Sequence, residues 1–172
     1  MLFRSILEAL EKIGRRERLT LLHGTTVGTN TLLQRKGARV ALVTTAGFED
    51  AIENGRQARP KLYDWFFERA EPLVAAGLRF GGEERTSSEG EVLESPSRAE
   101  LQSLSKNVRE QKPEALAISL LFSFANPQNE QAVAGALEPL GIPLSVSHQI
   151  LPEFREYERT STVVVKDRKS VV

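Results

Sequence analysis

The chain has no cysteine, no excess of charge of one sign and no long apolar run, and each absence excludes a class of protein. Without cysteine there are no disulfides, thiolate zinc sites or cysteine nucleophiles. Lysine plus arginine and aspartate plus glutamate each number 23, so a general electrostatic attraction to nucleic acid or to an anionic membrane is not supported. No apolar run is long enough to span a bilayer, and no secretory signal is recognisable. We expect a soluble, cytoplasmic protein that binds neither nucleic acid nor membranes.

Familiar nucleotide and metal motifs are missing as well. No Gly-Lys-Ser/Thr follows a glycine-rich loop, and the Gly-x-Gly-x-x-Gly spacing of a dinucleotide-binding turn is absent. No spacing of histidine, aspartate and glutamate resembles a metal site, so no metal ligand is predicted. What remains is an ordinary globular composition, 40% apolar and 27% charged, in a chain of 172 residues that can form one domain or two small lobes.

Short apolar runs alternate with amphipathic runs, which predicts an α/β fold with a largely parallel sheet and one hairpin. Strands are expected at 19–22, 39–45, 115–122 and 144–148, with the hairpin turn at 87–90. Helices are expected at 2–17, at 29–36 with Gly37 as the residue that ends it, at 48–54, after Ser97, and after Asn126. Ser97 with Glu100 three residues later is a capping-box signature, and Asn126 before Pro127 is a typical helix start.

Polar residues follow the expected strands. His23 follows the first strand, Thr44 and Thr45 end the second, and Ser123 and His148 stand at the ends of the last two. In open α/β sheets, ligands bind outside the carboxyl ends of the strands. This pattern predicts a ligand crevice at that edge.

The most informative segment runs from Leu19 to Asn30. A short apolar strand gives way to a loop of glycines and hydroxyls, and a helix is expected to begin inside that loop. Free backbone N–H groups and the positive end of a helix dipole would then meet at one spot, which suits a phosphate or a polar small molecule. The spacing is equally compatible with a tight turn and a helix cap. The candidate binding residues are Gly24, Thr25, Thr26, Gly28, Thr29 and Asn30, with His23 beside them.

Two histidines and two arginines are further candidates. His23 and His148 could each be a general base, a phosphate contact or a metal ligand, although a lone histidine is more often structural. Arg56 and Arg59 could clamp a carboxylate or phosphate through paired hydrogen bonds. The alternative for the arginines is surface ion pairing, with Glu53 or Asp64 as the partners.

Two other segments are expected to be structural. Residues 153–159 mix both signs of charge with aromatic side chains, which is typical of a solvated surface. An aromatic cluster is expected to pack in the core or at an interface, and its members are Tyr63, Trp65, Phe66 and Phe67.

Several longer segments, taken together, are more specific than the spacing of any single motif. They are 23–33, 35–50, 55–60, 84–93, 117–130 and 147–162, which include His-Gly-Thr-Thr-Val-Gly-Thr-Asn, Leu-Val-Thr-Thr-Ala-Gly-Phe-Glu-Asp, Gly-Arg-Gln-Ala-Arg-Pro and Glu-Tyr-Glu-Arg-Thr-Ser-Thr. In this order they resemble the N-terminal region of the hydantoinase A / 5-oxoprolinase / acetone carboxylase β-subunit family. The likeness runs from about Leu19 to about Val163.

The resemblance implies an ATP-dependent hydrolase of cyclic amides such as hydantoins or 5-oxoproline, with the ribonuclease-H-like fold of actin-like ATPases in this region. It implies ATP and Mg²⁺ as cofactors of the complete enzyme and a second hydantoinase-type subunit as a partner. ATP would phosphorylate the lactam carbonyl, which makes a better electrophile for water. The matching loop positions 23–26 and 28–30 become nucleotide or phosphate contacts, and Arg56 and Arg59 become substrate-side contacts. No catalytic residue is assigned.

Two departures from the family pattern concern the ends of the likeness. The family's Asp-x-Gly-Gly-Thr-Phe-Thr-Asp loop is not found before Leu19, and the likeness stops after Val163. We therefore expect a helical lead-in at 1–18 with a non-native start, the family domain at 19–163 and a non-native tail at 164–172. Such a fragment would hold part of a nucleotide-phosphate site and be inactive alone. The alternatives are a non-catalytic binding or assembly module, as in a piece of an acetone-carboxylase-like subunit, and a standalone phosphate-binding protein.

Overall fold

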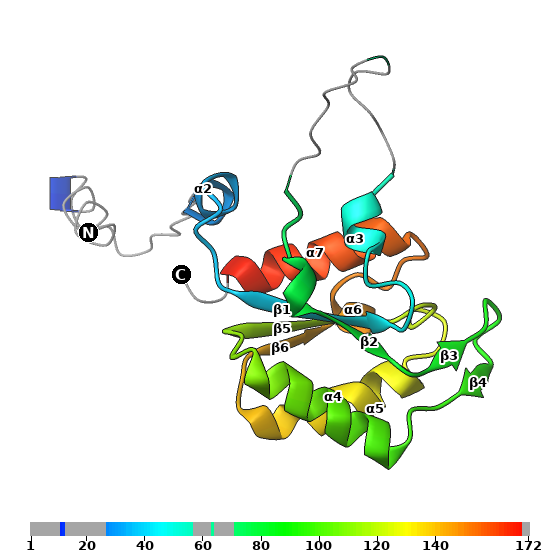
Figure 1. The fold of residues 1–172 in the computed structure, drawn as a ribbon. Coiled ribbons are helices and arrows are strands. Elements are labelled where there is room, and N and C mark those ends of the chain that lie inside the picture. Colours follow the sequence, from blue (N-terminus) through cyan, green and yellow to red (C-terminus); the bar gives the residue numbers. More distant parts are fainter. Residues whose placement is uncertain (1–10, 13–26, 57–62, 64–70, 170–172) are drawn as a thin grey trace.

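A four-stranded parallel sheet organises the chain in the computed structural model, which describes residues 11–12, 27–56, 63 and 71–169 (Figure 1). The strand order is β2-β1-β5-β6, and a separate antiparallel hairpin pairs β3 with β4. The expected parallel sheet with one hairpin is therefore confirmed. The strands are β1 (Val40–Thr45), β2 (Arg79–Gly82), β3 (Arg85–Thr86), β4 (Val92–Glu94), β5 (Ala115–Ser119) and β6 (Leu144–Val146).

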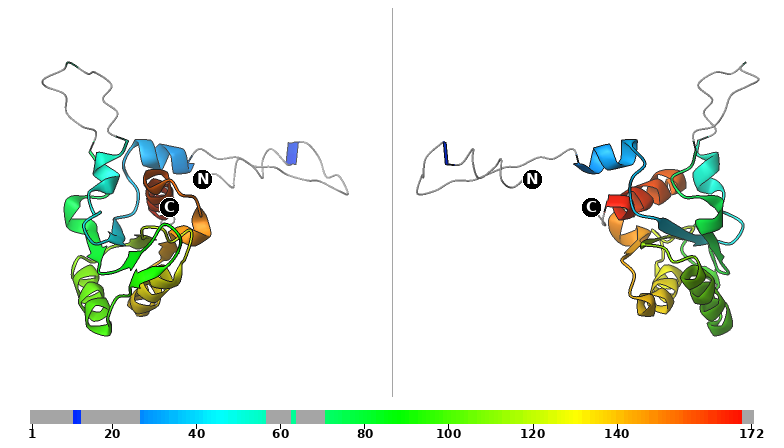
Figure 2. Two further views of the ribbon diagram at one scale, coloured as in Figure 1. Left: turned by 90° about the vertical axis from the view of Figure 1, so that its right-hand side faces the viewer. Right: turned by 60° about the vertical axis from the view of Figure 1, so that its left-hand side comes forward.

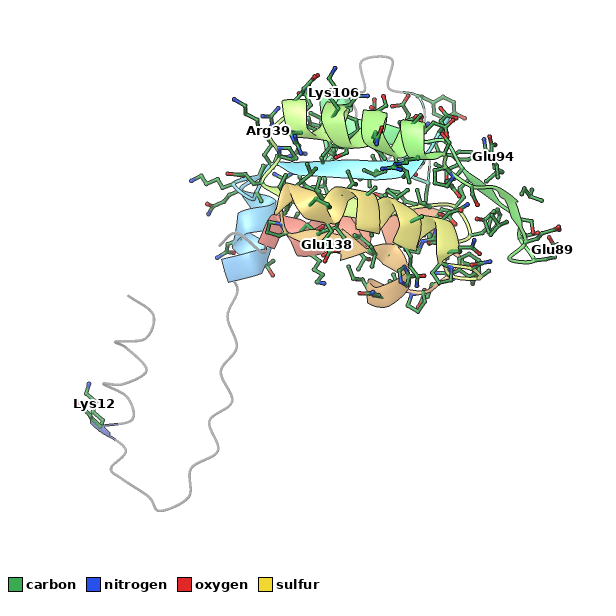
Figure 3. The ribbon with its side chains drawn as sticks, turned by 90° about the horizontal axis from the view of Figure 1, so that it is seen from below. Lys12, Arg39, Glu89, Glu94, Lys106 and Glu138 are labelled. Atoms are coloured by element: carbon green, nitrogen blue, oxygen red, sulfur yellow. The ribbon has the colours of Figure 1, made fainter. Side chains whose placement is uncertain are left out.

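Helices cover both faces of the sheet. α4 (Arg98–Glu110) and α5 (Gln128–Leu137) lie side by side on one face, and α7 (Glu156–Lys169) crosses the other (Figure 1; Figure 3). The shorter elements are α2 (Val27–Leu33), α3 (Ala51–Asn54), α6 (Ser147–Ile150) and the 3₁₀ turns η1 (Ala76–Leu78) and η2 (Glu138–Leu140). No helix within the described ranges is long and apolar enough to cross a membrane.

The two central strands, β1 and β5, are buried along their whole length. Alternate residues of β1 serve opposite faces: Val40 and Leu42 pack on the α7 side, while Ala41 and Val43 pack on the side of α4 and α5. A strand covered on both faces favours apolar side chains throughout. Val40–Val43 and Ala115–Ile118 are runs of this kind, and they are what predicts these two strands from the sequence.

The capping box at Ser97 is confirmed, whereas α5 begins one residue later than expected, with Pro127 rather than Asn126 at the N-cap position. At the start of α4 the Ser97 hydroxyl accepts a hydrogen bond from the Glu100 backbone N–H at 3.3 Å, and the Glu100 carboxylate accepts one from the Ser97 N–H at 2.6 Å. The Asn126 side-chain oxygen accepts a hydrogen bond from the Gln128 N–H at 3.0 Å. These caps fix where α4 and α5 begin.

Several expected element boundaries are wrong: the strand expected at 115–122 ends at Ser119, and the helix expected at 48–54 begins at Ala51. α2 ends at Leu33, and the residue with positive φ after it is Arg35, not the expected terminator Gly37. Gly37 has a different role, because a Cβ at this position would lie 2.8 Å from the Arg168 carbonyl oxygen of α7. The strand expected at 144–148 stops at Val146, and His148 lies in the short helix α6.

The C-terminal residues continue α7. The helix runs to Lys169. Residues 164–169, which were expected to form a tail, therefore belong to the same helix as the residues before them. Val163 and Val164 are both buried in the core on the α7 side of the sheet. The division of the chain at 18 and 163 stays a prediction. Of the aromatic cluster, Tyr63 is exposed, which excludes a core position for it in the described chain, and Trp65, Phe66 and Phe67 lie outside the described residues.

Asp167 of α7 provides a pH-dependent test of this packing. Asp167 is 1% exposed, and its burial raises the pKa of its carboxyl group from 3.8 to about 6. A hydrogen bond from the Ser145 side chain of β6 acts in the opposite direction and lowers the pKa. Because the folded-state pKa lies above the unfolded value, the ionised group costs stability, and this cost grows as the pH rises from about 4 through about 6. We expect Asp167→Asn to raise the free energy of unfolding at pH 7.5 by about 1–2 kcal/mol after allowance for solvent screening.

Urea unfolding of both chains at about pH 5 and pH 7.5 measures this effect. The gain should be larger at the higher pH. Glu138→Gln is the matched control, since Glu138 is exposed on η2, and it should leave the pH dependence unchanged. A gain from Asp167→Asn that is the same at both pH values would contradict the assignment.

Candidate functional site at the carboxyl edge of the sheet

Most residues of the predicted phosphate loop lie outside the described part of the chain. This applies to His23, Gly24, Thr25 and Thr26, and also to Arg59. The helix expected to begin within the loop is present as α2, whose first turn contains Gly28, Thr29 and Asn30. Thr29 and Asn30 are both exposed there.

The structure places α2 at the end of the sheet where β1 begins (Figure 2). There Arg168 of α7 donates a side-chain hydrogen bond to the Arg35 carbonyl oxygen at 3.2 Å, and the Ala38 N–H donates to the Arg168 carbonyl oxygen at 3.3 Å. A short connection from a helix to the following strand requires this placement. Thr29 and Asn30 therefore do not join the residues at the carboxyl ends of the strands.

Arg56 follows α3 and forms an ion pair with Glu158 of α7. Its side chain remains 61% exposed. Arg56 thus forms a surface ion pair, as the alternative expected, although with Glu158; of the two expected partners, Glu53 contacts Arg79 at 2.8 Å and Asp64 lies outside the described residues. Arg79 also contacts Asp50, at 2.7 Å.

Three of the polar residues expected at the strand ends, Thr45, Ser123 and His148, lie at the carboxyl edge in two groups around two buried carboxylates, whereas His23 lies outside the described residues. In the first group, the carboxylate of Glu84 accepts hydrogen bonds from the Thr45 hydroxyl and, at 2.9 Å, from the Asn129 side-chain nitrogen. Thr45 in turn accepts a hydrogen bond from the Leu121 N–H at 2.9 Å. This group joins the end of β1, the start of the hairpin and α5.

The second group surrounds Glu130 of α5, which is 0% exposed. One carboxylate oxygen accepts hydrogen bonds from the Ser147 hydroxyl at 2.7 Å and from the Leu120 N–H at 3.2 Å. The other accepts the His148 backbone N–H at 3.0 Å and also contacts Nδ1 of the same histidine. Ser123 completes the group through a hydroxyl–hydroxyl hydrogen bond to Ser147 at 2.9 Å. The expected residues Ser123 and His148 are therefore brought together.

Arg159 of α7 is the third buried charge at this edge. The solvated surface expected at 153–159 holds for the exposed residues 153–155 and 157 and is wrong for Arg159. The residue is 0% exposed, and its guanidinium donates to the carbonyl oxygens of Leu120 at 2.6 Å and Glu153 at 3.1 Å. It also forms an ion pair with Glu156. Burial raises the pKa of the Glu156 carboxyl group, and the charge of Arg159 acts in the opposite direction.

A pocket of about 320 Å³ lies between the edge strand β2 and α4. None of the binding residues predicted from the sequence lines it. Among the residues that the structure describes, no group of three histidine or acidic side chains could hold a metal ion. The pocket is lined by Phe80, Leu101 and Leu104 together with Glu83, Ser103 and Asn107.

The sequence analysis missed both buried carboxylates as site residues. A signal was present for Glu130, because it stands three and seven residues before Val133 and Leu137 and so shares the buried face of α5. An acid on an apolar helix face is buried only with partners, so this spacing indicates a hydrogen-bonded carboxylate. Glu84 lies in a loop between short strands and offers no comparable pattern.

The chain matches the family described as "Hydantoinase/oxoprolinase N-terminal region" over residues 2–141. The match begins ahead of the expected domain start at Leu19.

Three curated relatives show how much of a longer protein this chain represents. An uncharacterised protein of Methanocaldococcus jannaschii is 40% identical over 84% of this chain and 22% of its own length. The caprolactamase subunit alpha of Pseudomonas jessenii is 36% identical over 84% of this chain and 21% of its own length. The acetophenone carboxylase gamma subunit of Aromatoleum aromaticum is 34% identical over 83% of this chain and 22% of its own length. The chain thus spans about a fifth of the length of these relatives.

Two solved structures share the fold. The ATP-dependent caprolactamase from Pseudomonas jessenii superposes with a TM-score of 0.83 at 30% identity, over 98% of this chain and 26% of that chain. Nucleotide-free acetone carboxylase superposes with a TM-score of 0.75 at 26% identity, over 84% of this chain and 22% of that chain.

Proposed function

This chain belongs to the hydantoinase/oxoprolinase N-terminal region family, and we propose that it is part of an ATP-dependent enzyme that hydrolyses cyclic amides. The observation that carries the proposal is the superposition of nearly the whole chain on an ATP-dependent caprolactamase. A lactam is a resonance-stabilised amide, and phosphorylation of its oxygen by ATP makes the carbonyl carbon a better electrophile. We also propose that the parallel sheet belongs to a ribonuclease-H-like lobe of the actin-like ATPase type.

The nucleotide contacts in this proposal are the loop residues before and within the first turn of α2. Backbone N–H groups beside glycines and threonine hydroxyls are suitable donors to phosphate oxygens, so the residue types fit the group. They are Gly24, Thr25, Thr26, Gly28, Thr29 and Asn30, with His23 adjacent. Arg56 and Arg59 are proposed to face the substrate. We assign no residue of this chain to Mg²⁺, since the described residues contain no group of three or more histidine or acidic side chains placed to hold a metal ion.

Partner segments are part of the proposal. Two of the relatives are named as subunits, and this chain spans about a fifth of their length. We propose that the remaining parts of the nucleotide site and the substrate site come from further segments or from a second subunit. On this account the chain alone binds ATP weakly and does not turn it over.

A non-catalytic assembly module is the second candidate, and one observation favours it. The relatives include a carboxylase subunit as well as a caprolactamase subunit, so the region that they share with this chain is not tied to amide hydrolysis. Exposed apolar side chains such as Leu33 and Phe154 could meet a partner. Gel filtration, which measures the oligomeric state, and a calorimetric titration with MgATP together separate the two candidates. Self-association without ATP binding supports the module, and a monomer that binds ATP supports the nucleotide site.

Calorimetric titration of the chain with MgATP tests the nucleotide site. We expect Thr26→Val to weaken binding about tenfold or more, because it removes one hydrogen bond to a charged phosphate. The matched control is Thr162→Val, which makes the same chemical change at an exposed position of α7 that is not among the predicted contacts and should leave the affinity unchanged. Equal affinities for the parent chain and Thr26→Val, or no binding at millimolar MgATP, would contradict the proposal.

A further inference from the structure

His148 presents two N–H positions to a single oxygen atom. Its backbone N–H donates to one carboxylate oxygen of Glu130 at 3.0 Å, and its ring nitrogen Nδ1 contacts the same oxygen. A carboxylate oxygen only accepts hydrogen bonds, so Nδ1 carries the proton in this arrangement. The lone pair of the neutral ring is then on Nε2, the nitrogen that does not face the carboxylate.

Hydrogen bonds hold the Glu130 carboxylate in place, so that it can orient the imidazole ring of His148. Its second oxygen accepts hydrogen bonds from the Ser147 hydroxyl at 2.7 Å and from the Leu120 N–H at 3.2 Å. The carboxylate is therefore tied to the end of β5 and the start of α6 while it projects from α5. A buried carboxylate that orients an imidazole through Nδ1 is the arrangement that makes Nε2 a proton acceptor in hydrolytic enzymes.

The pair lies where ligands of parallel sheets bind. β5 and β6 end beside it, and α6 follows β6 without a connecting loop. The titratable and charged groups packed around the pair are Glu156 and Arg159 of α7, which form an ion pair with each other. No group of three or more histidine or acidic side chains among the described residues is placed to hold a metal ion. The His148 side chain is 12% exposed, whereas that of Glu130 is fully buried.

We propose that His148 is a proton-transfer residue for a water or hydroxyl oxygen at the carboxyl edge, with Glu130 as its positioning residue. The assignment rests on the proposed function, because the attack of water on a carbonyl carbon is the step that uses a base. The water proton forms the new bond to Nε2, the water oxygen uses the freed electron pair to bond to the activated carbon, and the π pair between that carbon and the ring nitrogen moves onto the nitrogen. The Glu130 carboxylate offsets the charge of the imidazolium.

Nitrogen NMR of the imidazole rings in the full chain tests the geometry without any ATP. The sequence has only two histidines, so the His148→Gln variant assigns the signals. In the neutral ring we expect the Nδ1–H form at His148, whereas a free imidazole favours the Nε2–H form. Glu130→Gln should reduce the Nδ1–H population, and Glu138→Gln, an exposed change of the same kind, should not. An Nε2–H ring at His148 in the parent chain would overturn the proposal even if Glu130→Gln fails to fold.

Access to Nε2 is tested on the parent chain by reaction with diethyl pyrocarbonate, with the modified peptide identified by mass. We expect His148 to be modified in the folded chain. Modification of His148 only after unfolding would show that Nε2 is enclosed, and the pair would then be structural. In the assembled enzyme, His148→Gln should lower kcat with little change in KM and remove the acidic limb of the pH–rate profile. Retention of that limb would overturn the role of His148, whereas failure to bind ATP would count only against the proposed function.

Discussion

Glu130→Ala should destabilise the chain by about 3–5 kcal/mol in its free energy of unfolding. The substitution removes the acceptor for the Leu120 N–H, the Ser147 hydroxyl and both N–H groups of His148. At a fully buried position these donors cannot regain water without opening the structure, so their desolvation cost remains. Urea unfolding monitored by circular dichroism measures the change.

Glu138→Ala is the control for this experiment. Glu138 is exposed at the end of α5, and Figure 3 labels it on the same side of the sheet as α5, so it is the same residue type without buried partners. We expect a change within about 0.5 kcal/mol for this variant. If Glu130→Ala were as mild as Glu138→Ala, the carboxylate would not hold the carboxyl edge together.

Arg159→Met should have an effect of similar size, about 3–5 kcal/mol. Methionine fills much of the same volume but leaves the carbonyl oxygens of Leu120 and Glu153 without their donor and Glu156 without its counter-ion. The pKa of the Glu156 carboxyl group is already raised by burial, and without Arg159 it should rise further. Part of the lost stability should therefore return at acidic pH, where Glu156 is protonated.

Arg155→Met supplies the comparison. Arg155 is exposed one turn earlier and lies over the ring of Phe154, also an exposed residue, so its charge is solvated. Its replacement should change the free energy of unfolding by less than about 1 kcal/mol. Equal effects at 155 and 159, or a loss at Arg159→Met that does not depend on pH, would contradict the buried ion pair.

The parts of the fold that the sequence predicts well are those set by local chemistry. β1 and β5 each begin with four apolar residues in a row, as suits strands covered on both faces, and the α4 cap depends on two residues three positions apart. Such signals are contained in a few neighbouring residues, so no knowledge of the tertiary arrangement is needed to recognise them.

The errors arise where tertiary contacts override local pattern. Residues 153–159 have the sequence pattern of a charged surface, yet Arg159 is buried. Its guanidinium donates to the carbonyl oxygen of Leu120, the residue that follows β5. Gly37 looks like a helix terminator, yet it is small because Arg168 packs against it. In both cases the partner is more than thirty residues away in the sequence, so a window of neighbouring residues cannot contain the cause.

The candidate site follows the same division. Ser123 and His148 were expected at the carboxyl edge from their places after strands, and the structure brings them together. The carboxylate between them comes from α5, which the strand-end argument did not consider. Thr29 and Asn30 lie at the other end of the sheet because α2 leads directly into β1 (Figure 2).

Amide NMR of the isotope-labelled chain during a titration with MgATP tests the central claim most directly, namely that this chain contributes phosphate contacts to a nucleotide site. The account predicts saturable shifts at the amides of Gly24, Thr25, Thr26, Gly28, Thr29 and Asn30, and smaller changes at the controls Glu138 and Thr162. Unchanged amides throughout 24–30 at millimolar MgATP would contradict it.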